Sequence, residues 1–241
     1  SARGCGYEYW SSLAGQALSG IERQACKWGA AEDAAAESLA GFQALGNLYQ
    51  SSQTRRSLAI TQWKRGKLSE ALATLQAGVA EAQEAATRLQ LTYSSMLEAL
   101  IRIHLGEHDK ARIILTDVRA SLRPTDDARS KMLVVEYLGD VDLEQGNAEP
   151  ALALYREALT QALALVPRGD IVAELRRRIA ECHLLMDRPA EAKAEAMAAL
   201  QLCREINERY DEAATYRILA LACAKLARPE EARKYFAQGF A

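Results

Sequence analysis

The sequence predicts an all-α protein, specifically a right-handed superhelical α-solenoid built from antiparallel helix hairpins. Three observations predict this class. The 241 residues include only 14 glycines and 5 prolines, and these two residues have the lowest helix propensities. Hydrophobic residues make up 49% of the chain, which is typical of a globular protein with a core. One local pattern also recurs at a nearly constant interval, as it does in helical repeat proteins.

The recurring pattern places two small residues on either side of a turn. Each copy has an alanine five residues after the turn, and these anchoring alanines are Ala71, Ala111, Ala151, Ala192 and Ala232. Their separations are 40, 40, 41 and 40 residues. A second small residue precedes each turn by seven positions, at Ala59, Ala99, Gly139, Ala180 and Ala220. Two small residues that face each other let helix axes approach to about 8 Å. Each copy therefore predicts a tight hairpin.

Glycine and proline mark the expected helix ends. The positive φ that ends a first helix is expected at Gly66, Gly106 and Gly146. Proline is tolerated at the start of a second helix, as expected for Pro150, Pro189 and Pro229. Breaks between hairpins are predicted near 86–87, at 122–126 with Thr125 or Asp126 as the helix cap, and at 166–170.

Two parts of the chain fit the pattern less well. Residues 7–50 are interpreted as a sixth, irregular hairpin, with a turn at Gly29 and Ala34 in the anchoring position. Terminal repeats are commonly atypical because one face is uncovered. In the second copy, Glu98 and Arg102 occupy positions where apolar residues are expected. That copy can therefore be aligned with the others in either of two registers, one residue apart.

These residues resemble a tetratricopeptide repeat (TPR). The third copy shows the match best, with Leu138-Gly139, Gly146, Ala151, Tyr155 and Ala158. The resemblance implies five repeats over 52–241 in one continuous solenoid, preceded by an atypical hairpin at 1–51. The family's usual period is about 34 residues, so the 40-residue period here lengthens each helix. Long repeats of this kind look like the helical-repeat regions of bacterial signalling and transcription regulators, such as the maltose-regulon activator type. The chain's end within a second helix suggests a fragment of a longer protein.

Composition argues against several classes of function. The formal charge of −2 gives no general attraction to nucleic acid or to an anionic membrane. No apolar run reaches the roughly 18 residues that a membrane span needs. The five cysteines are widely spaced and odd in number, which favours free thiols in a reducing compartment. We therefore expect a cytoplasmic protein, although a signal peptide removed earlier would leave the same sequence.

The sequence offers little catalytic or metal-binding chemistry. His104 and His108 flank the predicted turn at Gly106, so they point away from each other. Cys182 and His183 are adjacent on a helix and cannot converge on one group. No phosphate loop or nucleophile elbow is present. We expect no catalytic residues, no metal and no cofactor, and hence a protein that is not an enzyme.

The resemblance implies a partner-binding groove lined by the first helices. The positions that face this groove are Arg56, Trp63, Lys64, Tyr93, Met96, Glu136, Asp140, Glu144, Arg177, Glu181 and Arg217. Tryptophan, tyrosine, methionine and arginine are residue types that anchor protein interfaces. Trp63 could instead pack between hairpins. The three carboxylates share one helix face and repel one another, so either a cationic partner or Arg177 is expected to neutralise them.

We therefore predict a non-enzymatic protein–protein interaction module that binds a protein or peptide in the groove. The alternative is a sensor domain of a transcription regulator that binds a small-molecule effector in the same groove. Direct contact with nucleic acid is not expected. The uncovered faces of terminal repeats could also pair two copies as a homodimer.

Overall fold

The computed structural model describes residues 2–84 and 88–239, and within these ranges it contains twelve helices and no strand. In chain order the helices are α1 (Ala2–Gln24), α2 (Trp28–Ala44), α3 (Leu48–Lys64), α4 (Leu68–Glu84), α5 (Arg88–His104), α6 (His108–Ser121), α7 (Ala128–Glu144), α8 (Ala148–Leu165), α9 (Asp170–Leu185), α10 (Pro189–Ile206), α11 (Arg209–Lys225) and α12 (Pro229–Gln238). The all-α prediction is confirmed. No helix in these ranges is long and apolar enough to cross a membrane.

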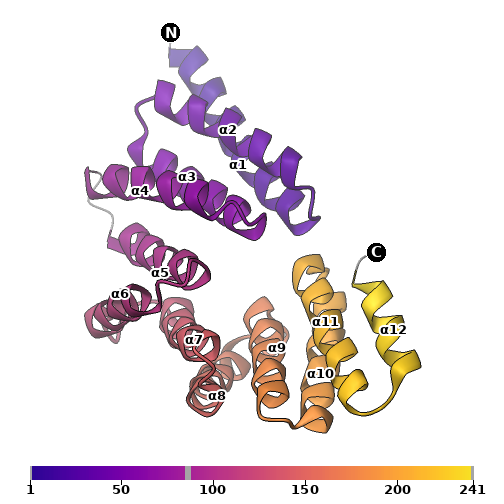
Figure 1. Cartoon of the computed structure of the whole chain (residues 1–241). Helices are drawn as coiled ribbons and strands as arrows, with labels where there is room; N and C mark the ends of the chain where they lie inside the picture. Colours follow the sequence, from indigo (N-terminus) through magenta and orange to yellow (C-terminus); the bar gives the residue numbers. More distant parts are fainter. Residues whose placement is uncertain (1, 85–87, 240–241) are drawn as a thin grey trace. The chain divides into compact units, whose positions relative to one another are not determined.

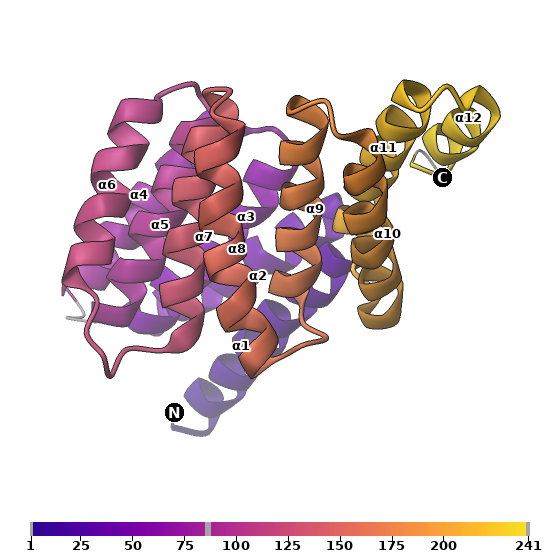
Figure 2. The same ribbon diagram turned by 90° about the horizontal axis from the view of Figure 1, so that it is seen from below.

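Consecutive helices form antiparallel hairpins joined by tight turns (Figures 1 and 2). Gly66, Gly106 and Gly146 take φ values of +76°, +76° and +80°, as predicted. At the first of these turns, the Lys67 N–H donates to the Gln62 carbonyl at 2.9 Å. Such bonds satisfy the last carbonyl groups of the first helix. The later turns place Asp187 and Ala227 in the same left-handed region at +55° and +56°.

The small residues lie where the two helices of a hairpin meet. Of the ten predicted positions, all are buried except Ala232, which is half-buried on the last helix. The closest approach involves Gly139, where an added Cβ would lie only 2.7 Å from Cε1 of Tyr155. Ala99 and Ala111 are fully buried, so the second repeat keeps the register of the others.

Two local predictions need correction. The first hairpin turns at Cys26, with φ of +57°, and not at Gly29, which lies inside α2. The buried anchoring residue is consequently Ala31, three positions before Ala34. Helix α7 is capped by Asp127, whose Oδ1 accepts from the Ser130 N–H at 2.9 Å. Asp126, one of the two residues predicted as the cap, instead accepts a hydrogen bond from the Arg123 N–H through its carboxylate. The break predicted near 86–87 falls outside the described residues.

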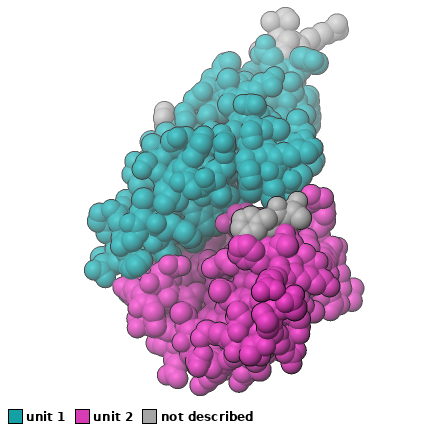
Figure 3. All heavy atoms as spheres, turned by 45° about the vertical axis from the view of Figure 1, so that its right-hand side comes forward, with its two compact units in different colours: residues 1–118 teal, residues 119–241 magenta. Residues whose placement is uncertain are grey.

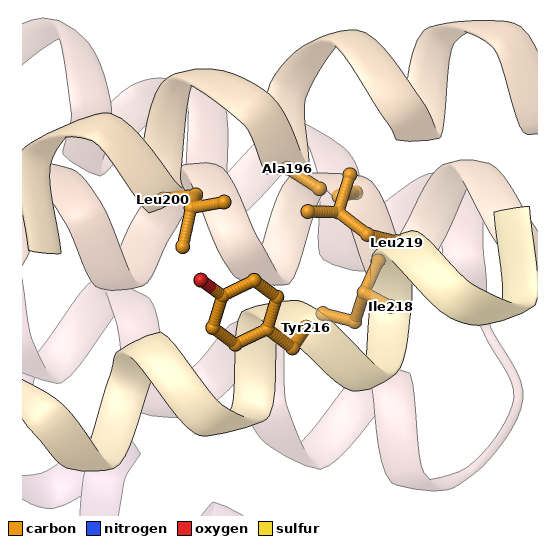
Figure 4. Close-up of a cluster of buried hydrophobic side chains, with 6 residues drawn as sticks. Ala196, Leu200, Tyr216, Ile218 and Leu219 are labelled. Atoms are coloured by element: carbon orange, nitrogen blue, oxygen red, sulfur yellow. The ribbon is translucent and has the colours of Figure 1, made fainter. Parts of the chain in front are cut away.

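The chain divides into two compact units, residues 1–118 and 119–241, shown in Figure 3. In unit 2, Tyr216 of α11 packs with Ala196 and Leu200 of α10 in a buried apolar cluster (Figure 4). Ala180, Ile218 and Leu219 complete this cluster. Each unit is thus a set of hairpins with its own core. One continuous right-handed solenoid stays a prediction.

Candidate partner-binding surface

All eleven predicted groove residues lie on first helices of the hairpins. We call these helices the first-helix layer: α1, α3 and α5 in unit 1, and α7, α9 and α11 in unit 2. Within unit 1, α3 contacts both α1 and α5, and within unit 2, α9 contacts α11. The layer carries the predicted residues because the repeat register places them on one face of each first helix.

A cavity of about 260 Å³ opens between α3 and α5 in unit 1. Its lining residues are Tyr49, Gln53, Arg56, Arg88, Leu89, Gln90 and Tyr93. The Arg56 guanidinium lies over the Tyr93 ring, 5.2 Å from the ring centroid. Stacking of this kind fixes the plane of the guanidinium against the ring. The structure therefore brings two of the predicted residues into one site.

Sequence reasoning missed the other five lining residues. They lie in the first two turns of α3, which begins at Leu48, and of α5, which begins at Arg88. The 40-residue period was the available signal, because extra residues in each hairpin must lengthen its helices. Gln53 Nε2 donates to the Tyr49 hydroxyl at 3.2 Å. The lengthened ends thus supply aromatic and amide groups to the cavity.

Trp63 and His104 meet at the other end of the same two helices. Their rings pack edge to face with centroids 5.4 Å apart, and Trp63 Nε1 lies 3.3 Å from His104 Nδ1. Trp63 and Lys64 are half-buried. Met96, by contrast, is a core residue and presents no surface to a partner. The apolar and aromatic half of the predicted groove is therefore only partly accessible.

The carboxylates predicted on α7 are largely buried by the protein itself. Glu136 and Asp140 are 0% and 2% exposed, whereas Glu144 is exposed. The Tyr155 hydroxyl donates to Asp140 Oδ1 at 2.7 Å, and Arg178 Nε lies 3.2 Å from the same oxygen. The cation that neutralises Asp140 therefore comes from α9, but it is Arg178 and not the predicted Arg177.

Arg177 is buried and serves a second group of carboxylates. Its Nε lies 3.1 Å from Asp211 of α11, and its other nitrogens lie 3.5 Å from Glu174 and 3.4 Å from Glu181. Arg217, which is exposed, donates to Glu181 at 2.8 Å. Ion pairs therefore join α7 to α9 and α9 to α11. They hold the first-helix layer of unit 2 together by charge as well as by packing.

Glu136 has no comparable partner. Neither carboxyl oxygen has a hydrogen-bond partner among the described residues. Burial, and then repulsion from Glu174 and Asp140, raises the pKa of Glu136 well above its usual value. Burial, and then repulsion from Asp211, also raises the pKa of Glu174 to about 7. For Glu181, burial acts in the same direction, but Arg178 and Arg177 outweigh it and lower its pKa.

The described residues contain no group of three or more His, Cys, Asp or Glu side chains able to hold a metal ion. Burial raises the pKa of both Cys182 and Cys203 to about 12. These thiols therefore stay protonated near neutral pH, and a protonated thiol is a poor nucleophile. The chemistry that the layer offers is binding through arginine, aromatic and amide groups.

Comparisons with known proteins agree with this architecture. Residues 171–241 match the tetratricopeptide repeat family model. The chain has a TPR-like helical repeat fold, and the family match covers its C-terminal part. A comparison with curated protein sequences found no match.

Solved structures provide several matches to the TPR-like fold. NprR in complex with its cognate peptide NprX has a TM-score of 0.73 and 19% identity over 97% of this chain and 66% of that chain. PlcR of Bacillus thuringiensis, in complex with the peptide PapR7 and DNA, has a TM-score of 0.70 and 15% identity over 85% of this chain and 79% of that chain. The Rap conjugation gene regulator of plasmid pLS20, in complex with a Phr peptide, has a TM-score of 0.78 and 13% identity over 92% of this chain and 60% of that chain. The chain thus spans less than two thirds of the NprR and Rap chains.

Proposed function

We propose that this protein is a non-enzymatic interaction module that binds a peptide or an extended segment of a partner protein on its first-helix layer. The cavity between α3 and α5 carries the proposal. It combines a stacked arginine, two tyrosines and two amide side chains at one place on the layer. Tyrosine and arginine are enriched among the residues that dominate binding energy at protein interfaces.

The structural neighbours support a peptide as the partner. NprR, PlcR and the Rap regulator have each been solved in complex with a peptide. We further propose that this chain acts in a cytoplasmic signalling or transcription-regulatory system, since one neighbour is a conjugation gene regulator and another is a quorum sensor. A small-molecule sensor is less well supported, because each of these neighbours has been solved with a peptide. Direct contact of this chain with nucleic acid is not part of the proposal.

A peptide-display selection against the immobilised full chain tests this function. We expect the selection to enrich particular peptides from a random library. These peptides should bind the chain in a fluorescence anisotropy titration. The double change Arg56→Ala and Tyr93→Ala should weaken binding at least about tenfold, because truncation of interface anchors commonly costs more than 1.4 kcal/mol.

The matched control is Arg168→Ala, whose side chain is 79% exposed in the loop between α8 and α9. This change should leave the affinity as it is. A selection that enriches no peptide, or enriched peptides that bind the double variant equally well, would refute peptide binding at this place on the layer.

A further inference from the structure

Helix α1 turns several polar side chains toward the rest of unit 1. The Ser19 hydroxyl donates to the Ala31 carbonyl of α2 at 2.8 Å, and Gln16 Nε2 donates to the Thr54 hydroxyl of α3 at 2.9 Å. Ser12 is also buried on this side. An ordinary surface helix has the opposite arrangement, with apolar side chains inward and charged ones outward.

The outward face of α1 carries large apolar side chains. Four of them are 78%, 66%, 47% and 62% exposed, in the order Tyr7, Trp10, Leu18 and Ile21. Glu8 is the one charged residue among the exposed residues described between positions 6 and 24. An apolar face of this kind on a surface helix is typical of a site of contact with another macromolecule.

The exposed positions follow the spacing of a coiled-coil seam. Separations of three and four residues alternate along the helix, and every position of the series is exposed: Tyr7, Trp10, Ala14, Ala17, Ile21 and Gln24. Side chains at this spacing form one line along a helix and pack between the side chains of a facing helix. The face therefore fits another α-helix with the same spacing.

The seam is complementary to itself when two copies run antiparallel. Its large side chains lie toward the ends and its alanines lie at the centre. Ala14 of one copy then meets Ala17 of the other, which lets the helix axes approach to about 8 Å. Trp10 of each copy lies opposite Ile21 of the other. A two-fold interface joins the same patch of both copies, so each of these contacts occurs twice.

The size of the face suits a specific pair. Aromatic side chains bury about 150–250 Å² each, so the four large side chains offer on the order of 500 Å² per copy and about 1,000 Å² per pair. This area lies near the lower limit for a specific interface. The Trp10 ring is also held before pairing, because it packs edge to face on Tyr9, whose ring packs on Phe42 of α2. A side chain that is already fixed loses less entropy on binding.

We propose that two copies of this chain form a symmetric dimer through an antiparallel pair of α1 helices. None of the described residues that line the cavity between α3 and α5 belongs to α1. The pairing is therefore separate from peptide binding at that cavity and does not require it.

Sedimentation equilibrium of the full chain tests the pairing. We expect the average mass to rise from 26.4 kDa toward twice that value as the concentration increases. The dissociation constant should be on the order of 10 μM, as suits an interface of modest area. Ile21→Glu should weaken the dimer at least about tenfold, because it places a charge in the apolar seam. The matched control is Ile113→Glu on α6, where the isoleucine is equally 62% exposed, and it should leave the dimer unchanged.

Three results would overturn the proposal. The first is the mass of a single chain at every concentration up to about thirty times the expected dissociation constant, at which a dimer would predominate. The second is a dimer that Ile21→Glu leaves intact or that Ile113→Glu weakens equally. The third is a monomer that binds phosphatidylcholine vesicles, which would assign the face to a lipid surface. If Ile21→Glu loses its helical circular dichroism, Trp10→Glu provides the same test nearer the other end of the seam.

Cysteine cross-linking tests the direction of the two helices. Antiparallel pairing places position 14 opposite position 17 of the other copy, whereas parallel pairing places each position opposite itself. An oxidised mixture of Ala14→Cys and Ala17→Cys chains should yield several-fold more disulfide-linked dimer than either variant alone. Wild-type protein, which has the same native cysteines, gives the background. More linked dimer from either variant alone than from the mixture would overturn the antiparallel arrangement.

Discussion

Replacement of Glu136 by methionine should stabilise the protein, and the gain should grow as the pH rises. The carboxyl group is fully buried on α7, and neither oxygen has a hydrogen-bond partner among the described residues. Methionine has a similar length and no polar group to satisfy. The nearby cations lose little, because Arg178 keeps Asp140 and Glu181, and Arg177 keeps Asp211.

The magnitude has two parts. An unsatisfied buried polar group costs about 1–3 kcal/mol even when it is neutral. The pKa of Glu136 is also raised well above its ordinary value of 4.5, by burial first and by neighbouring carboxylates second. A carboxyl group with a raised folded-state pKa contributes full stability below its unfolded pKa, and this contribution is lost as the pH rises toward the folded pKa. In that window the wild-type protein loses about 1.4 kcal/mol per pH unit relative to the variant.

Urea unfolding followed by far-UV circular dichroism, between about pH 5 and pH 8, measures this difference. Glu174, whose pKa is raised to about 7, is present in both proteins and so contributes mainly to their common pH dependence. Glu144→Met changes an exposed carboxylate on the same helix and should alter stability by less than about 0.5 kcal/mol at any of these pH values. A Glu136→Met variant that is less stable than wild type, or a difference that stays constant with pH, would refute the reasoning.

Three further predictions follow from the packing. Gly139→Ala should lower the free energy of unfolding by roughly 1 kcal/mol, because the added Cβ meets the Tyr155 ring. Gly20→Ala, where the added Cβ has open space, should instead raise the free energy of unfolding by up to about 1 kcal/mol. Urea unfolding curves that rank the two variants in the opposite order would contradict this account. Ala227→Gly should raise the melting temperature, because glycine adopts the positive φ of this turn without strain, and should increase the free energy of unfolding by about 1 kcal/mol at most. An unchanged or lower melting temperature would count against the turn geometry. Cys182 and Cys203 should react with iodoacetamide far more slowly than the half-buried Cys26, as mass spectrometry of labelled peptides can measure; equal labelling rates in the folded protein would show that these thiols are accessible.

Much of the fold could be predicted because its determinants are local and periodic. The small residues that face each other across a hairpin are visible as a spacing, and a glycine after a helical segment marks a turn. The repeat spacing also placed turns at Asp187 and Ala227, which take positive φ without glycine. Prediction failed at Cys26, which takes positive φ in the irregular first hairpin, where the 40-residue spacing gives no guide. No local signal distinguishes Cys26 from its neighbours in that role.

The candidate site was predicted less well, because a repeat register fixes the face of a helix but not its exposure. Arg56 and Glu136 occupy equivalent positions, three residues before the small residues Ala59 and Gly139. The arginine lines an open cavity, whereas the glutamate is fully buried. The difference depends on which side chains come from the next hairpin, about 40 residues away in the sequence.

This dependence on the next hairpin gives the two units different properties. In unit 2, residues from α7, α9 and α11 with opposite charges meet and neutralise one another, as in the contacts of Arg178 with Asp140 and of Arg177 with Asp211. Such buried pairs are costly to separate, since removal of one partner leaves the other charge unsatisfied. In unit 1, α3 and α5 instead line an open cavity with Tyr49, Tyr93 and the stacked Arg56. First helices joined by buried ion pairs are suited to rigidity, whereas first helices that leave an open cavity lined by aromatic side chains are suited to an external ligand. Binding is therefore expected in unit 1, at the cavity.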